Sequence, residues 1–287
     1  MEGGLAEVAI ERLSSAWACA VKPVRMHVDH QERAVVEVRA GHDLRVIKVD
    51  TSASRFKTEV HMLGAAAAGG VPVPRVLLAD ATLPSVLVLT RVGGVGLNDG
   101  NVSAWTDAGR VIKRIHRLPV ALQPFEPAMS WRQAMFSWID EAITTGVTGE
   151  ELTPAAVEWL RDALRQRALN TDAPLDCPLH GDCQPDHFLL EGDRVAGVID
   201  FGDACSGDPA WDLAVLTLWQ PERLIDVLAG YAPDPVTRTR LRRIVPVYRT
   251  LRHLGAARWQ RQHGYDPTPD LAALRQIVSN AGGPLSL

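Results

Sequence analysis

The spacing of apolar residues changes near residue 92, and this change limits the folds that the chain can adopt. Before it, short β-rich runs alternate with turn residues, whereas beyond it apolar residues recur every three or four positions, as on one face of a helix. The sequence therefore predicts an α+β protein of two lobes, a small sheet-rich lobe over residues 1–92 and a larger helical lobe over residues 93–287. A chain of 287 residues, 46% of them hydrophobic, is long enough for each lobe to bury a core.

The individual elements follow from the same patterns. Gly41 separates two runs rich in β-branched residues and predicts a hairpin, while Gly69 with Gly70 ends the first predicted helix. Strands are expected at residues 34–38, 44–49, 75–79, 85–89 and 195–199, and helices at residues 51–68, 108–115, 131–142, 154–168 and 241–251.

Composition excludes several classes of function. With a formal net charge of −4, the chain lacks the positive electrostatic field that is typical of nucleic-acid-binding proteins. No apolar run approaches the ~18 residues that a membrane span requires. The N-terminus is acidic where a signal peptide would be basic, and the sparse cysteines (Cys19, Cys177, Cys183 and Cys205) predict reduced thiols. We therefore expect a cytoplasmic protein, a monomer or weak dimer, whose partner is a small molecule and neither nucleic acid nor a membrane.

Three linked blocks between residues 179 and 214 carry the candidate chemistry. They read His-Gly-Asp-Cys-Gln-Pro-Asp-His from residue 180, Val-Ile-Asp-Phe-Gly-Asp from residue 198 and Gly-Asp-Pro-Ala-Trp-Asp from residue 207. Phosphoryl transfer needs one carboxylate to orient the attacking hydroxyl and another to hold the metal ion that bridges the phosphates. Asp182 suits the first role, and Asp200, which follows an apolar strand, suits the second.

These blocks resemble those of the kinase-like small-molecule phosphotransferases, which include aminoglycoside, macrolide and peptide-antibiotic phosphotransferases and choline and homoserine kinases. The resemblance implies a bilobal protein-kinase-like fold, ATP or GTP as phosphate donor, and a magnesium ion. It also implies structural roles for Asp208 and Asp212, which would brace the loop that carries Asp182, and a loop-orienting role for His180.

The resemblance extends to the first lobe. Lys48 ends a predicted strand, like the lysine that contacts ATP phosphates in kinases, and Glu59 lies in the following helix where its ion-pair partner is expected. Residues 87–94 resemble the linker whose backbone binds adenine, which places those hydrogen bonds at Thr90 and Val92.

Two features depart from the family pattern. The turn at residues 28–33, which corresponds to the phosphate-covering loop, contains no glycine. His187 occupies the position of the usual metal-binding asparagine, as in macrolide phosphotransferases, and its nitrogen favours Mn²⁺ relative to Mg²⁺.

Acidic residues indicate the acceptor. Between residues 119 and 157 the acids outnumber the single base, Arg132, and they predict either an acidic pocket wall, with Asp140 and Glu141, or a solvated helix face. Asp203 is a further candidate for binding a substrate ammonium. These acids favour a cationic antibiotic, an aminoglycoside or a cyclic peptide of the capreomycin and viomycin type, and hence a resistance function. Macrolides, choline and homoserine remain alternatives.

Three other interpretations stay open. His180, Asp182, His187 and Asp200 could form the metal cage of a hydrolase, or His187 and the glycine-free turn could mark a nucleotide-binding pseudokinase. An arginine-rich segment from Arg238 to Arg261 could bind nucleic acid, but the apolar spacing within it favours arginines on solvated faces of amphipathic helices, paired to acids elsewhere.

Overall fold

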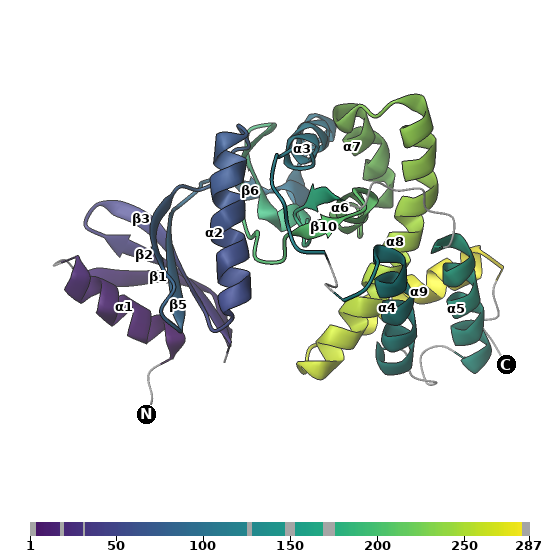
Figure 1. The fold of residues 1–287 in the computed structure, drawn as a ribbon, viewed down its shortest axis with the longest axis horizontal. Coiled ribbons are helices and arrows are strands. Elements are labelled where there is room, and N and C mark those ends of the chain that lie inside the picture. Colours follow the sequence, from purple (N-terminus) through teal and green to yellow (C-terminus); the bar gives the residue numbers. More distant parts are fainter. Residues whose placement is uncertain are drawn as a thin grey trace. The chain divides into compact units, whose positions relative to one another are not determined.

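The computed structural model describes residues 4–17, 20–30, 32–124, 128–146, 153–168 and 176–282. The chain divides into two compact units (Figure 1). Unit 1 comprises residues 1–120 and 180–204, and unit 2 comprises residues 121–179 and 205–287. The expected α+β class is confirmed, because sheets and helices both contribute to the fold. The two lobes predicted to meet at residue 92 remain a prediction, since the compact units interleave along the chain.

The main sheet of unit 1 has five antiparallel strands in the order β1-β2-β3-β5-β4. These strands are β1 (Val21–His30), β2 (Arg33–Ala40), β3 (Asp43–Asp50), β4 (Val76–Asp80) and β5 (Ser85–Thr90). The predicted hairpin is confirmed as β2 and β3, and Gly41 takes the positive φ of 63° that their turn requires.

Helices α1 (Leu5–Ala16) and α2 (Ala53–Ala68) lie on opposite faces of this sheet (Figure 1). Because side chains alternate along a strand, Ile47 and Val49 join the apolar core beneath α1, whereas Lys48 between them points to the other face. Ser52 caps α2 by accepting a hydrogen bond from the Arg55 amide, and Gly69 follows its last residue, as predicted.

The strand and the helix at the start of unit 1, β1 and α1, have no counterpart in the sequence prediction. β1 was not predicted because most of its residues are exposed and it contains Pro23. It therefore lacks the alternation of apolar and polar residues that marks a half-buried strand. α1 buries only small and aliphatic residues, Ala6, Ala9 and Leu13, against the sheet.

The remaining elements of unit 1 come from two distant parts of the sequence. A second antiparallel sheet contains β6 (Val95–Gly96), β8 (Phe188–Glu191) and β9 (Arg194–Val198) in the order β6-β8-β9. It lies with α3 (Val102–Ile115), which the sequence predicts from Ala108 onward, and the 3-10 turns η1 (Leu97–Asp99) and η2 (Pro185–His187). β9 is the strand predicted to precede Asp200.

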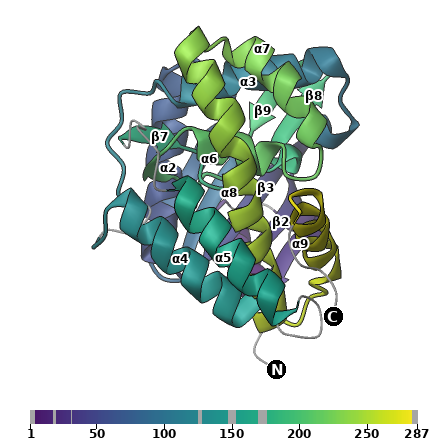
Figure 2. The same cartoon turned by 90° about the vertical axis from the view of Figure 1, so that its right-hand side faces the viewer.

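Unit 2 is built around the long helix α8, which packs against α4, α5, α6 and α9 (Figure 2). Its helices are α4 (Trp131–Gly146), α5 (Pro154–Ala168), α6 (Ala210–Leu216), α7 (Leu224–Tyr231), α8 (Pro235–Gln262) and α9 (Thr268–Asn280), with η3 (Pro221–Arg223) and a ladder of β7 (Cys177–Leu179) and β10 (Cys205–Gly207). The predicted cap of α5 is present, because Thr153 Oγ1 accepts a hydrogen bond from the Ala156 amide at 3.2 Å.

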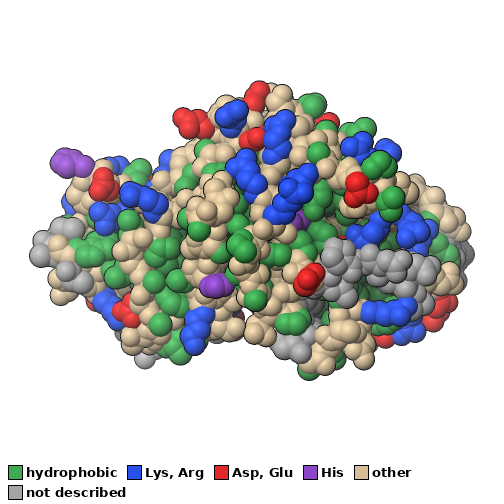
Figure 3. Space-filling model, turned by 45° about the horizontal axis from the view of Figure 1, so that its top comes forward, with side chains coloured by type: hydrophobic (Ala, Val, Ile, Leu, Met, Phe, Trp, Pro, Cys, Tyr) green, Lys and Arg blue, Asp and Glu red, His purple; other side chains and the backbone are tan. Residues whose placement is uncertain are grey.

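The arginine-rich segment lies on α8, and part of it is paired as predicted. Arg240 forms an ion pair with Asp208, and Arg258 lies 2.5 Å from Glu141. Figure 3 shows Lys and Arg side chains spread among acidic and apolar ones over the visible face. These observations favour a structural role for the paired arginines, which form ion pairs within unit 2.

Two negative findings concern the described residues. None of their helices is both long and apolar enough to span a bilayer. No disulfide joins Cys177, Cys183 and Cys205, and Cys19 lies outside the described residues.

Candidate active site

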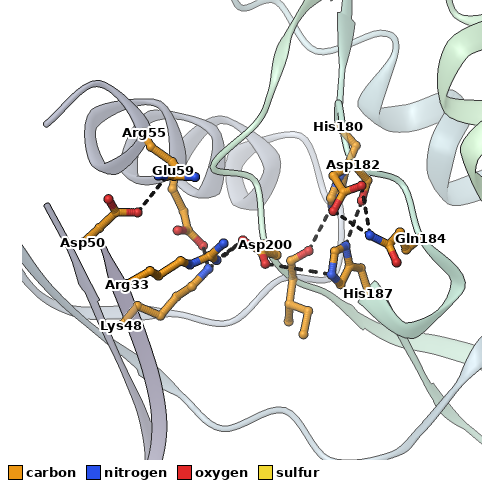
Figure 4. Close-up of polar contacts among 11 residues, drawn as sticks. Arg33, Lys48, Asp50, Arg55, Glu59, His180, Asp182, Gln184, His187 and Asp200 are labelled. Carbon is orange, nitrogen blue, oxygen red and sulfur yellow. Dashed lines mark hydrogen bonds and ion pairs between the residues drawn. The ribbon is translucent and has the colours of Figure 1, made fainter. Parts of the chain in front are cut away.

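Unit 1 brings together side chains from β2, β3, α2 and the loops that flank β8 and β9 (Figure 4). Lys48, Glu59 and Asp200 form one polar cluster, and Asp182 with His187 forms a second beside it. All five were predicted as site residues, and the fold places them within a single compact unit.

Lys48 links the sheet, the helix and the loop after β9. Its Nζ donates a hydrogen bond to Glu59 Oε1 and another, of 2.9 Å, to Asp200 Oδ1. Lys48 and Glu59 are both buried, and although burial lowers the pKa of Lys48, the charges of Glu59 and then Asp200 raise it above its usual value. Lys48 is therefore a fixed cation held between two carboxylates.

Asp200 is held in a constrained backbone conformation. Its φ is 69°, in the left-handed region that non-glycine residues seldom adopt, and such strain is concentrated at functional sites. Burial would raise the pKa of Asp200, but Lys48 and then Arg33, whose Nη2 lies 2.6 Å from Oδ1, hold it well below its usual range. The carboxylate is thus ionised and has two cations on its Oδ1 side.

The loop that carries Asp182 is hydrogen-bonded to the loop that carries Asp200. His180 is fully buried, and its Nε2 donates to the carbonyl of Ile199 at 2.9 Å, directly before Asp200. Gly181 has a φ of 85°, and a Cβ there would lie 1.9 Å from the carbonyl oxygen of Asp203, so only glycine permits this approach. The loop-orienting role expected of His180 agrees with this geometry.

The carboxylate of Asp182 is positioned by its own loop. Gln184 Nε2 lies 3.0 Å from Asp182 Oδ1 and 2.9 Å from Oδ2, so the amide holds the carboxylate in one orientation. The side chain stays partly exposed, where an incoming hydroxyl could reach it.

His187 and Asp200 fit a shared divalent ion. His187 Nδ1 lies 2.8 Å from the carbonyl oxygen of Asp182, and because a carbonyl only accepts, Nδ1 carries a proton, so that in the neutral imidazole Nε2 has the free lone pair. Nε2 faces Asp200 Oδ2 at 3.8 Å. One nitrogen and one oxygen ligand leave most positions of a hexacoordinate ion to phosphate oxygens and water, the usual arrangement for Mg²⁺ at nucleotide sites.

The described residues contain no group of three or more His, Cys, Asp or Glu side chains arranged to hold a metal. In particular His180 directs its Nε2 to a backbone carbonyl. The four-residue metal cage of a hydrolase, one of the alternatives from the sequence, is therefore not formed in this part of the chain.

Comparison with known proteins agrees with this arrangement. Residues 25–244 match the phosphotransferase enzyme family, a span that includes both polar clusters. The chain belongs to the phosphotransferase enzyme family. The predicted resemblance is thereby confirmed at the level of the family.

The curated relatives of this phosphotransferase family member are homoserine kinases of several bacteria. A homoserine kinase of Gluconobacter oxydans is 27% identical over 156 residues, which are 50% of this chain and 48% of that protein. The chain thus spans about half the length of this curated relative.

Solved structures share the fold at low identity. Aminoglycoside phosphotransferase APH(4)-Ia, in a ternary complex with ADP and hygromycin B, is 18% identical with a TM-score of 0.71, covering 92% of this chain and 94% of that one. Macrolide 2'-phosphotransferase MphH from Brachybacterium faecium, as apoenzyme, is 18% identical with a TM-score of 0.66, covering 93% and 95%. The fold is therefore that of the kinase-like phosphotransferases.

The predicted adenine linker of this phosphotransferase family member, residues 87–94, begins within β5 and continues beyond its last residue, Thr90. The Thr90 amide donates to the Arg75 carbonyl at 2.9 Å, and Thr90 Oγ1 accepts from the Arg75 amide at 2.9 Å. Val92 packs so closely against β9 that a Cβ on Gly197 would lie 2.6 Å from Val92 Cγ1. The linker is fixed at both residues, while its contacts to adenine remain a prediction.

The predicted acceptor acids lie in different surroundings. Asp203 is exposed, and local desolvation, followed by the negative charges of Asp182 and Asp200, raises its pKa. Asp140 accepts two hydrogen bonds from Arg165, at 2.7 and 2.6 Å, and Glu141 pairs with Arg258. Their roles in acceptor binding stay predictions, and the paired arginines reduce the charge that Asp140 and Glu141 could offer. Other acids of the segment, Glu126, Glu150 and Glu151, lie outside the described residues.

Two residues of the site were not predicted. Gln184 has no signal in the sequence beyond its place two residues after Asp182. Arg33 is the last residue of the glycine-free segment 28–33, and only the register of β2 with β3 reveals that it lies on the same face as Lys48.

Proposed function

We propose that this phosphotransferase family member transfers the γ-phosphoryl group of ATP to a hydroxyl of a small molecule that carries an ammonium group. One observation carries the proposal: a lysine held between two carboxylates, with a partly exposed aspartate on the adjoining loop. This arrangement supplies a cation for phosphate, a carboxylate for a metal ion and a carboxylate for the acceptor.

In this mechanism Asp182 accepts the proton of the acceptor hydroxyl as its oxygen forms the new bond to phosphorus. The oxygen that bridged the β- and γ-phosphates leaves as part of ADP, whose negative charge Lys48 helps to neutralise. Gln184 and His180 keep the two loops in place, so that the carboxylates need not reorganise during the reaction. When bound, Mg²⁺ or Mn²⁺ would be held by Asp200 and His187 and would neutralise the phosphates.

For the acceptor we propose first a cationic antibiotic, an aminoglycoside or a capreomycin-type peptide. The carboxylates of Asp182, Asp200 and Asp203 lie close enough for Asp203 to feel the other two charges, and such a group attracts a cation. The fold shared with APH(4)-Ia, whose structure contains hygromycin B, is consistent with this acceptor class.

A second candidate is a small amino alcohol such as homoserine. It is favoured by the curated relatives, which are homoserine kinases in several bacteria. An amino alcohol also carries one ammonium group and one hydroxyl, the two groups that the site would have to recognise.

A coupled ADP-release assay tests the function and separates the candidates. Acceptors would be hygromycin B, a second aminoglycoside, capreomycin, viomycin, a macrolide, choline and homoserine, each with Mg²⁺ and with Mn²⁺. We expect turnover with one ammonium-bearing class, and mass spectrometry should show the acceptor heavier by one phosphoryl group. Nucleotide binding without any phosphorylated product would instead support the pseudokinase.

The identity of residue 187 should set the metal preference. We expect His187→Asn to retain activity and to improve half-saturation by Mg²⁺ relative to Mn²⁺ by about an order of magnitude, because an amide oxygen is a harder ligand than an imidazole nitrogen. Metal titrations of both proteins at saturating nucleotide measure this ratio. An unchanged ratio would remove His187 from the set of ligands.

Asp203 should contribute to the affinity for the acceptor and not to the affinity for ATP. We expect Asp203→Asn to raise the KM of the cationic acceptor by roughly threefold to tenfold, and less at high salt, while leaving the KM of ATP unaltered. The double variant Asp140→Asn with Glu141→Gln tests the other predicted acids, for which the arginine pairs lead us to expect a smaller effect. If Asp203→Asn changes both KM values equally, Asp203 does not act on the acceptor.

A further inference from the structure

The phosphate-covering turn of this chain lacks the residues that normally provide its chemistry. β1 ends at His30 and β2 begins at Arg33, with Gln31 and Glu32 between them. Turns that bind phosphate through backbone amides use glycine, because the backbone must approach the anion closely. A chain without glycine there needs another source of positive charge beside the phosphates.

Arg33 supplies such a charge from the first position of β2. The register pairs Arg33 with Asp50 and Val35 with Lys48, with one residue pair between these two, so that the arginine and the lysine lie on the same face of the sheet. Both side chains reach the same oxygen, Asp200 Oδ1, at 2.6 Å from Arg33 Nη2 and 2.9 Å from Lys48 Nζ. Figure 4 shows the two cations side by side, converging on Asp200.

The two cations differ in what else holds them. Lys48 keeps a second carboxylate, Glu59, whereas the hydrogen bond of Arg33 within the described residues goes to Asp200. The Arg33 side chain is only 14% exposed, so its charge needs a nearby anion. Asp200 turns its other oxygen, Oδ2, toward His187. A ligand that engages Asp200 would weaken the only hydrogen-bonded ion pair of Arg33 in this part of the chain and leave the guanidinium able to bind another anion.

We infer that Arg33 is a phosphate-binding residue, which takes the β- and γ-phosphates of the nucleotide together with Lys48 and replaces the missing glycine-rich turn. The inference rests on the proposed function. A guanidinium suits this task, because its planar fork donates two hydrogen bonds to phosphate oxygens, whereas an ammonium acts as a point charge. Without nucleotide, Asp200 keeps the guanidinium at the place where phosphate is to bind.

Binding of a graded series of ligands tests the inference without any turnover. Isothermal titration would compare AMP-PNP, ADP, AMP and adenosine on the wild type, Arg33→Ala and Arg33→Lys, with Mg²⁺ and with EDTA. We expect Arg33→Ala to weaken AMP-PNP and ADP by about tenfold or more while changing adenosine by less than about twofold, as for loss of a charge-assisted hydrogen bond. The AMP-PNP and ADP affinities of Arg33→Lys should lie between those of the wild type and Arg33→Ala.

Arg39→Ala is the matched control, because Arg39 lies on the same strand but is exposed, and it should behave as wild type. If Arg33→Ala proves too unstable by thermal unfolding, Arg33→Gln compared with Arg33→Lys separates the charge from the side-chain length. An equal loss for adenosine, no loss at all, or tighter AMP-PNP binding would each overturn the inference. Failure of the wild type to bind AMP-PNP would overturn the proposed function as well. Equal AMP-PNP affinity of the wild type and Arg33→Ala would overturn the inference alone.

Discussion

Asp182→Ala is expected to lower turnover by about 10² or more, the scale of a lost general base, while nucleotide affinity stays within about twofold of wild type. The reason is the position of the carboxylate: Gln184 of its own loop donates to it, whereas the two cations Lys48 and Arg33 donate to Asp200. Single-turnover kinetics with the acceptor found in the panel, together with AMP-PNP titration, measure the two quantities separately.

Two variants sharpen this experiment. Asp182→Asn keeps the size of the side chain but cannot accept the proton, so it should lose nearly as much turnover as Asp182→Ala. Asp193→Asn changes an exposed aspartate in the turn between β8 and β9, and it should leave turnover intact. Near wild-type turnover of Asp182→Asn would exclude Asp182 as the base.

Asp208→Ala should cause the largest loss of stability among single substitutions in unit 2. The Asp208 carboxylate is fully buried and accepts hydrogen bonds from the Ala210 amide at 3.0 Å, from Tyr248 Oη at 2.9 Å and from Arg240. Its removal leaves a largely buried guanidinium without its counter-ion, which costs about 3–5 kcal/mol. Burial and the charge of Asp208 also raise the pKa of Tyr248, so its hydroxyl remains a donor at neutral pH.

Urea unfolding followed by tryptophan fluorescence measures this loss, because Trp131 donates to Tyr248 Oη at 2.9 Å and Trp211 packs beside it. The control is Asp234→Ala, which removes the exposed N-cap of α8 and should cost only about 0.5–2 kcal/mol. A midpoint for Asp208→Ala no lower than that of Asp234→Ala would show that the buried network contributes little. The sequence led us to expect that Asp208 braces the loop that carries Asp182, whereas its carboxylate accepts hydrogen bonds from α8 and from the start of α6.

Some of the local structure could be predicted because it depends on neighbours in the sequence. The hairpin of β2 and β3 follows from alternating β-branched residues around Gly41, and α2 follows from the cap at Ser52 and the stop at Gly69. β1 could not be predicted, since an exposed strand at the end of a sheet has no buried face to impose a pattern on its residues.

The sequence by itself determined the family and the candidate chemistry, because the order and spacing of the three blocks from His180 to Asp212 are properties of the chain alone. Only the tertiary structure decided which charges are available to a ligand. Asp140 and Glu141 read as an acidic wall in the sequence, yet arginines distant in the chain pair with both. In the sequence Arg33 is only the last residue of a turn without glycine, yet the register of β2 with β3 places it on the same face as Lys48. Ion pairs form between residues that are far apart in sequence, so their partners are set by strand register and helix packing, which no local pattern encodes.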